Sequence, residues 1–148
     1  MNIRPAVKED CAALLELVRG LAAFEKAPGA VTVSLEEMET AGFGPQPIWW
    51  AFVAETDEKI VAFALYYLRY STWKGVRLYL EDIYVDEPYR GRGIGGLLME
   101  KLIAEAREKK YSGLMWQVLD WNQDAIRFYQ RYGATFDGEW LNVTLALP

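Results

Sequence analysis

The chain has 148 residues, of which 52% are hydrophobic, and its 16 basic and 21 acidic side chains give a formal net charge of −5 at pH 7. This length and composition predict one domain spanning residues 1–148, and the acidic balance with scattered basic residues argues against a nucleic-acid partner. The lack of histidine and the single cysteine, Cys11, argue against a metal site, and no apolar stretch is long enough for a membrane span, so we expect a cytoplasmic protein.

The first third of the chain predicts one strand and two helices. Residues 2–5 are typical of a short strand, and residues 6–24 have the apolar periodicity of an amphipathic helix. Ser34 with Glu37 three residues later forms a capping-box pattern. A second helix should therefore begin at Ser34 and end near Gly42.

A meander of three strands follows. Residues 49–55, 59–70 and 76–85 are rich in β-branched and aromatic residues, and short polar turns separate them, which predicts antiparallel pairing. The third strand carries two adjacent acids, Glu81 and Asp82, which the alternation of side chains should point to opposite faces. A buried carboxylate needs a partner or a polar cavity, so we expect at least one of the two in a functional site. A structural ion pair at the strand edge is the alternative.

The run Arg90-Gly91-Arg92-Gly93-Ile94-Gly95-Gly96 joins this strand to a helix predicted over residues 95–110. Glycines remove Cβ atoms and allow positive φ, so backbone N–H groups can converge on a pyrophosphate at the positive end of the helix. The run also satisfies the loose dinucleotide pattern Gly-x-Gly-x-x-Gly, but residues 86–90 separate it from the strand, and no Lys-Ser or Lys-Thr follows as a P-loop requires. A turn that only tightens the strand-to-helix link is the bland alternative.

The last third of the chain predicts further alternation of strand and helix. Residues 114–119 indicate a strand, residues 123–132 a helix with Asn122 as N-cap and Gly133 after its end, and residues 135–147 one or two final strands. The complete order of elements predicts an α+β fold. Its central sheet is mixed, antiparallel in the first half and with one parallel pair joined by a crossover, and helices flank it.

Arg90, Gly93 and Gly95 have the spacing Arg-x-x-Gly-x-Gly behind a carboxylate-bearing strand, which resembles the acetyl-CoA loop of the GCN5-related N-acetyltransferases, the GNAT superfamily. Nearly the whole chain is similar to the diamine acetyltransferases, especially the spermidine/spermine acetyltransferase-like branch that includes thialysine N-acetyltransferases. The segments that carry this resemblance are residues 3–6, 24–26, 42–44, 70–75, 79–85, 89–95 and 119–123. The resemblance implies the GNAT fold, direct transfer of acetyl from acetyl-CoA to an amine, and a homodimer.

The same resemblance implies two sets of binding residues. Those expected to bind acetyl-CoA are Ile83, Tyr84, Val85, Arg90, Gly91, Arg92, Gly93, Ile94, Gly95, Gly96, Asn122, Ala125, Tyr129 and Arg131. Those expected to bind the amine are Phe24, Glu25, Glu81, Asp82, Gln117 and Glu139. Phe24 is a departure, because the polyamine enzymes carry tyrosine there, and the segment between Gly133 and Trp140 is shorter than in them.

Two residues are candidates for proton transfer. By the resemblance, Glu81 takes the proton of the incoming ammonium, directly or through water, and Tyr129 protonates the thiolate that leaves. An aromatic side chain of the core is the alternative for Tyr129. Cys11 lies on the predicted face of the first helix and is expected to be a small buried residue rather than a nucleophile.

These patterns together predict an N-acetyltransferase that acts on the primary amine of a small polyamine or of a lysine-like amino acid. Two other functions stay open. One is a non-catalytic domain that senses acyl-CoA or binds a protein, and the other is an N-acetyltransferase whose substrate is a protein.

Overall fold

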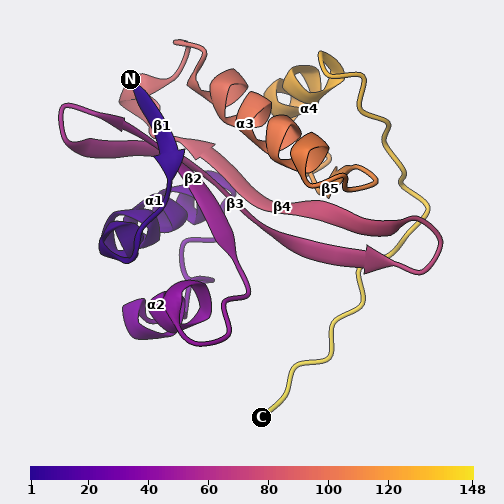
Figure 1. Cartoon of the computed structure of the whole chain (residues 1–148), viewed down its shortest axis with the longest axis horizontal. Helices are drawn as coiled ribbons and strands as arrows, with labels where there is room; N and C mark the ends of the chain where they lie inside the picture. The colour runs from indigo at the N-terminus through magenta and orange to yellow at the C-terminus, as the bar shows by residue number, and fades with distance from the viewer. The chain divides into compact units, whose positions relative to one another are not determined.

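The structure is a computed structural model that describes all 148 residues. Its contacts divide the chain into two compact units, residues 1–116 and residues 117–148. Figure 1 labels the helices and strands along the chain. None of the helices combines the length and the apolar character that crossing a bilayer requires.

The first unit contains a five-stranded sheet in the order β1-β2-β3-β4-β5. The strands are β1 (Asn2–Pro5), β2 (Trp50–Thr56), β3 (Lys59–Ser71), β4 (Gly75–Val85) and β5 (Leu114–Trp116). Neighbours from β1 to β4 pair antiparallel, whereas β4 and β5 pair in parallel. Parallel neighbours need a crossover, which α3 (Ile94–Glu108) supplies. The α+β class and the mixed sheet are therefore confirmed, although β5 is shorter than the predicted residues 114–119.

Helices cover both faces of the sheet, with α1 and α2 on one side and α3 on the other (Figure 1). The 3₁₀ turn Lys8–Asp10 precedes α1 (Cys11–Phe24), so this helix begins later than the predicted residue 6. The second helix, α2 (Leu35–Phe43), begins behind Ser34, whose hydroxyl accepts a hydrogen bond from the backbone N–H of Glu37 at 3.0 Å. The capping box thus marks the start of this helix as predicted.

The main core lies between α1 and the sheet. Cys11, Leu14 and Leu15 of the helix pack with Val53 and Phe63 of the sheet, and all five are buried. Burial raises the pKa of the Cys11 thiol to about 11, so the thiol stays protonated at neutral pH. This confirms the expectation that Cys11 is a packed core residue.

The second unit contains one helix and an extended end of the chain. The helix, α4 (Gln123–Gln130), is followed by Gly133, which has φ +73° and ends the helical turn. Residues 134–148 form neither helix nor strand, so the strands predicted over residues 135–147 are wrong for this structure. A strand needs a partner for its backbone hydrogen bonds, and alternating hydrophobicity in one segment does not supply that partner.

Candidate functional site

The loop between β4 and α3 has the backbone conformation that its glycines predict. Gly91 has φ +77° and Gly93 has φ +79°, and Gly93 is the N-cap of α3. A Cβ atom built on either glycine meets no heavy atom within 4 Å. The glycines are therefore required by the left-handed backbone conformation, and the loop surface beside them is open.

The start of α3 leaves backbone donors without partners. The first helical hydrogen bond runs from the N–H of Leu97 to the carbonyl of Gly93 at 3.1 Å. The N–H groups of Ile94, Gly95 and Gly96 donate to no backbone carbonyl. These three donors lie at the positive end of the helix, which suits them to bind the oxygens of a phosphate.

Aromatic rings and backbone carbonyls hold the two arginines of the loop. Arg90 donates from Nε to the carbonyl oxygen of Val85 at 2.9 Å, and its guanidinium lies 5.2 Å from the ring centroid of Phe24 and 5.3 Å from that of Tyr84. Arg92 lies 5.4 Å from the ring centroid of Tyr89. Such contacts orient a guanidinium without neutralising it, so both positive charges remain beside the loop. Phe24, predicted from sequence to contact the amine, is thus brought to Arg90 of the loop.

The last part of β4 has a neighbour on one side only. Pairing with β5 ends where Leu80 meets Trp116, whereas pairing with β3 continues to Val85. Within the sheet, residues 81–85 therefore present one unpaired edge. An extended molecule that carries amides can add to such an edge, which is the role predicted for Ile83, Tyr84 and Val85.

A β-bulge lies where this open edge begins. Leu65 of β3 pairs with Asp82, whereas the next residue of β3 pairs with Leu80, so Glu81 has no partner in the ladder. Tyr67, on the same face of β3 as Leu65, donates its hydroxyl to Oε1 of Glu81 at 2.9 Å. Both carboxylates therefore lie on one face of the sheet. The expectation that Glu81 and Asp82 point to opposite faces is wrong, because the extra residue shifts the alternation.

Three carboxylates gather on this face, and we call Glu25, Glu81 and Asp82 the acidic cluster. Burial, with smaller contributions from the negative charges of Glu81 and Glu25, raises the pKa of Asp82 to about 7. Glu25 caps the C-terminal end of α1, and burial raises its pKa above the ordinary value. The negative end of the helix adds to the charge of the cluster. This arrangement attracts a cation and provides a carboxyl group that exchanges a proton near neutral pH.

Two further aromatic residues lie beside the acidic cluster, and no sequence pattern indicated them. Tyr67 and Tyr79 pair across the β3–β4 hairpin, and their rings stack with centroids 5.2 Å apart. Arg69 lies 5.7 Å from the ring centroid of Tyr79. Once the hairpin register is known, the tyrosine of β3 that lies two residues from the bulge is a clear candidate. The strand pattern alone does not give that register.

The remaining predicted site residues lie in the second unit. Asn122 caps α4, with Oδ1 accepting from the backbone N–H of Ala125 at 3.2 Å. Tyr129 is buried, with 6% of its surface exposed, and it meets Phe128 edge to face at 5.4 Å. The guanidinium of Arg131 lies 5.7 Å from the ring centroid of Phe128. Asn122 therefore lies at the start of α4, and Tyr129 and Arg131 lie at its other end.

The two predicted amine contacts of the second unit lie outside α4. Gln117 donates from Nε2 to Oδ1 of Asn142 at 2.7 Å. Glu139 is exposed, and its backbone N–H donates to Oδ1 of Asp137 at 3.0 Å. Both of these hydrogen bonds are made within the second unit.

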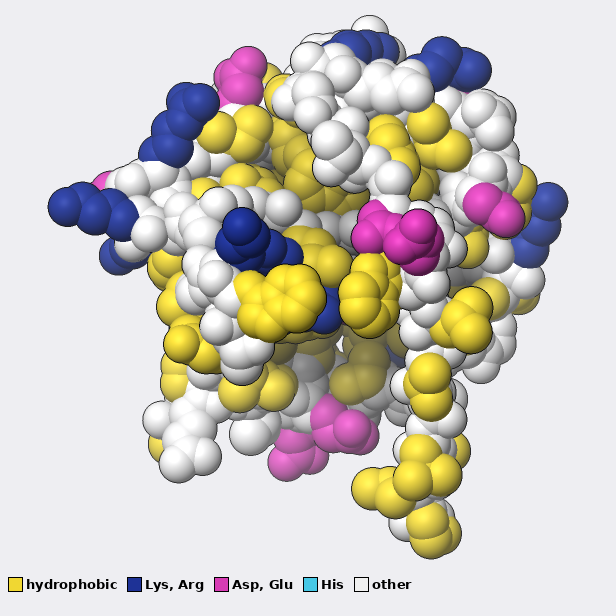
Figure 2. Space-filling view, turned by 90° about the vertical axis from the view of Figure 1, so that its right-hand side faces the viewer, with side chains coloured by type: hydrophobic (Ala, Val, Ile, Leu, Met, Phe, Trp, Pro, Cys, Tyr) yellow, Lys and Arg dark blue, Asp and Glu magenta, His cyan; other side chains and the backbone are white.

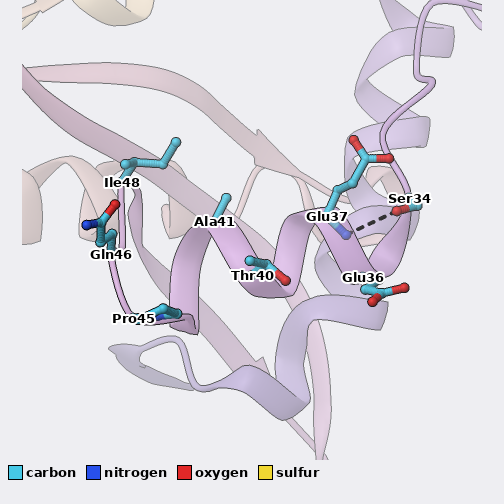
Figure 3. Close-up of a pocket in the computed structure, with 8 residues that line it drawn as sticks. All are labelled: Ser34, Glu36, Glu37, Thr40, Ala41, Pro45, Gln46 and Ile48. Atoms are coloured by element: carbon cyan, nitrogen blue, oxygen red, sulfur yellow. Dashed lines mark hydrogen bonds between the residues drawn. The ribbon is translucent and has the colours of Figure 1, made fainter.

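A separate hollow of the first unit lies elsewhere. It has a volume of about 630 Å³ and is lined by α2 and the connection to β2, including Ser34, Thr40 and Ile48 (Figure 3). None of the residues that line it is among the predicted site residues. The glycine loop, the open edge of β4 and the acidic cluster therefore define the candidate site in this unit.

Comparisons with known proteins relate the chain to acetyltransferases along most of its length. The family described as "Acetyltransferase (GNAT) family" matches residues 18–134. Thialysine N-epsilon-acetyltransferase of Bos taurus is 42% identical over 140 residues, which cover 89% of this chain and 82% of the relative. Spermidine/spermine N(1)-acetyltransferase-like protein 1 of Homo sapiens is 34% identical over 140 residues, which cover 90% of this chain and 20% of the relative.

The fold also matches that of a solved structure whose sequence is only distantly similar. A possible acetyltransferase from Clostridium difficile 630 matches with a TM-score of 0.82 at 19% identity, covering 99% of this chain and 98% of the other. At this identity, the match concerns the fold alone.

Proposed function

The chain belongs to the acetyltransferase (GNAT) family, and we propose that this acetyl-CoA-dependent N-acetyltransferase acts on the primary amine of a small polyamine or of a lysine-like amino acid. The observation that carries the proposal is the position of the acidic cluster at the bulge of β4. The open edge of the same strand follows directly, and the glycine loop comes after the strand ends. One strand thus brings an anion-binding backbone and a cation-binding set of side chains into the same region. We include in the proposal that residues 1–148 act as a single catalytic domain.

The backbone after the bulge fits acetyl-CoA. The unpaired N–H groups of Ile94, Gly95 and Gly96 suit the pyrophosphate, with Arg90 and Arg92 adding positive charge. The open edge of residues 83–85 suits the amides of the pantetheine arm, and an N–H of this strand would stabilise the developing oxyanion. When bound, acetyl-CoA supplies an acetyl thioester that is open to attack by an amine.

The acidic cluster prepares the amine. Glu25 and Asp82 attract its ammonium group, and Glu81 takes one proton, so that the neutral nitrogen can form a bond to the acetyl carbon while the carbon–sulfur bond breaks. The thiolate that leaves then takes a proton from Tyr129, and the second proton that the nitrogen releases as the amide forms returns the phenolate of Tyr129 to a phenol. A phenol that donates a hydrogen bond suits this step.

Other residues complete the proposed binding sites. We assign Asn122, Ala125 and Arg131 to acetyl-CoA, and Phe24, Gln117 and Glu139 to the amine. The relatives support the choice of amine, because the names of the two reported above refer to thialysine and to spermidine and spermine. A third relative, from Arabidopsis thaliana, is named for L-ornithine and is 35% identical over 57% of this chain. All of these are small compounds with a primary amine, which matches a cluster of carboxylates.

A homodimer and a cytoplasmic location are part of the proposal. The end of the chain exposes Leu141, Val143, Leu145 and Leu147 by 84% or more each, and Figure 2 shows hydrophobic side chains along this extended segment at the lower right. Water-exposed apolar residues in an alternating pattern suit pairing with a second copy. Sedimentation measurements test this state directly. The single reduced cysteine, which is buried, fits a reducing compartment.

The experiment that tests the function is release of free thiol from acetyl-CoA in the presence of separate amines. Spermidine, putrescine, lysine, thialysine and a lysine-containing peptide form the panel. We expect thiol release with one or more of the small amines and little with the peptide. Release with the peptide alone would indicate a protein acetyltransferase. Binding of coenzyme A without thiol release for any amine would indicate a non-catalytic domain and overturn the proposal.

A further inference from the structure

We propose that Tyr67 is a positioning residue for acetyl transfer, which holds Glu81 in the orientation that receives the proton of the amine. This inference rests on the proposed role of Glu81. Its basis is the hydrogen bond from the hydroxyl of Tyr67 to Oε1 of Glu81 at 2.9 Å. Oε1 is occupied by this donor, and Oε2 has no hydrogen-bond partner. One oxygen therefore fixes the carboxylate, and the other is left to accept a proton.

Glu81 needs such a partner because of its place in the sheet. Glu81 is a bulge residue and has no partner across the ladder. It is also exposed, so no neighbour packed around it limits the rotation of its side chain. Proton transfer requires the accepting oxygen to lie within hydrogen-bond reach of the amine. A donor on the neighbouring strand restricts the carboxylate to that position.

Tyr67 is itself held firmly. Its ring stacks on Tyr79, with centroids 5.2 Å apart and planes at 27°, and Arg69 lies 5.7 Å from the ring centroid of Tyr79. Arg69 also contacts Sδ of Met115 on β5 at 3.2 Å. The stacked rings and the contacts of Arg69 therefore link β3 with β4 and β5. Aromatic pairs of this kind fix ring positions, so the phenol oxygen has a defined place relative to the bulge.

The phenol stays a donor throughout the pH range in which the enzyme would work. Burial and the hydrogen bond to Glu81 raise the pKa of Tyr67 above its ordinary value, and Arg69 opposes this only in part. The other charged or titratable groups that face Glu81 are Tyr79 and Asp82 on its own strand, with Glu25 acting on Asp82 from the end of α1. Of these neighbours, only Tyr67 makes a hydrogen bond to Glu81.

The first test is Tyr67→Phe, which removes the hydroxyl and keeps the ring for stacking. We expect kcat/KM for the amine to fall by about 10- to 100-fold, the effect of losing a hydrogen bond to a charged group. The affinity for coenzyme A should stay unchanged. The loss should lie in kcat rather than in the KM of the amine, because the variant keeps the carboxylates that attract the ammonium group and loses only the contact that orients Glu81. Tyr70→Phe is the matched control, since this tyrosine of β3 is 72% exposed, and it should behave as the parent protein does.

A double-mutant cycle with Glu81→Gln separates positioning from a general structural role. If Tyr67 acts through Glu81, adding Tyr67→Phe to Glu81→Gln lowers the rate little further. Full multiplication of the two losses, or a loss in Tyr67→Phe that lies in the KM of the amine alone, would overturn the inference. An active parent protein that is insensitive to Tyr67→Phe would also overturn it and leave the proposed function standing. Absence of thiol release in the parent protein would instead contradict the proposed function itself.

Discussion

The two regions at either end of residues 81–85 of β4 offer different kinds of groups to a ligand. One, which we call the backbone end, is the loop and the start of α3, and the other, the side-chain end, is the bulge at Glu81. Beyond Val85, the loop and the start of α3 offer backbone N–H groups in a conformation set by Gly91 and Gly93. At the bulge, Glu81 and Asp82 offer carboxyl side chains, and burial and neighbouring charges raise the pKa of Asp82. The backbone end should therefore bind its ligand with little dependence on pH. The side-chain end should control the chemical step and its pH dependence.

Glu81→Gln should separate the two ends most strongly. Glutamine keeps the size of the side chain and cannot accept the proton, so we expect kcat/KM for the amine to fall by about 100- to 10,000-fold at neutral pH. Calorimetry should show that Glu81→Gln binds coenzyme A with the same affinity as the parent protein, because the glycine loop is unchanged. Glu108→Gln, at the exposed end of α3, is the control and should keep full activity. A large loss of coenzyme A binding in Glu81→Gln would show that the two ends are not independent.

Tyr129→Phe asks whether the chemical step also needs a group from the second unit. The change removes the phenol oxygen and keeps the buried ring, so α4 should stay folded. We expect kcat to fall by about 100-fold with the affinity for coenzyme A preserved, since a thiolate without its proton donor leaves poorly. The measurement is thiol release at saturating acetyl-CoA over a range of pH. Full turnover at every pH would rule out the acid role of Tyr129.

Gly93→Ala tests the backbone end. An alanine at φ +79° is strained by about 1–2 kcal/mol, and relief of that strain moves the N–H groups at the start of α3. We expect the dissociation constant of coenzyme A to rise by about tenfold, while the pH profile of the chemical step keeps its shape. Gly29→Ala is the control, because Gly29 has no positive φ and its Cβ meets no heavy atom within 4 Å. Equal affinity in the two variants would contradict the role given to the loop.

The same contrast explains what the sequence could predict. The glycine loop depends on φ preferences and helix capping within a few residues, and the predicted loop from Arg90 to Gly96 lies where the structure starts α3. The bulge at Glu81 depends on the register between β3 and β4, which no local pattern specifies. The contact of Tyr67 was missed for this reason, and the faces of Glu81 and Asp82 were predicted wrongly.

The end of the chain shows the same limit on prediction. Leu141, Val143 and Leu145 alternate with the polar residues Asn142 and Thr144, a pattern typical of a half-buried strand. These three apolar residues are nevertheless exposed, and they pair with no strand of this chain. The β-propensity of a sequence describes one segment, whereas a strand forms only when a second segment accepts and donates its backbone hydrogen bonds. Sequence patterns therefore predicted helices and turns, whose hydrogen bonds are local, but they could not specify which predicted strands find a partner: residues 2–5 pair with β2, whereas residues 135–147 pair with no strand.

Asp82→Asn should have the smallest effect on rate and a distinct effect on stability. In the unfolded chain this carboxyl ionises near its ordinary pKa of 3.8, whereas in the fold its pKa is about 7. The folded state therefore binds more protons between these values, and the free energy of unfolding falls as the pH rises from about 4 to about 7. At about 1.4 kcal/mol per pKa unit, the full decrease is about 4 kcal/mol. Asparagine has no such charge, so the variant should lack this decrease.

Urea unfolding at pH 4 and at pH 8 checks this expectation. Asp82→Asn should match the parent protein at pH 4 and exceed it in stability at pH 8, while its KM for the amine rises a few-fold because the acidic cluster has lost one charge. Asp57→Asn, in the exposed β2–β3 turn, provides the control and should follow the parent curve at both pH values. If Asp82→Asn followed it as well, burial would not be raising the pKa of Asp82. Asp82 would then make no pH-dependent contribution to stability, and the side-chain end of β4 would differ from the backbone end only through proton transfer by Glu81.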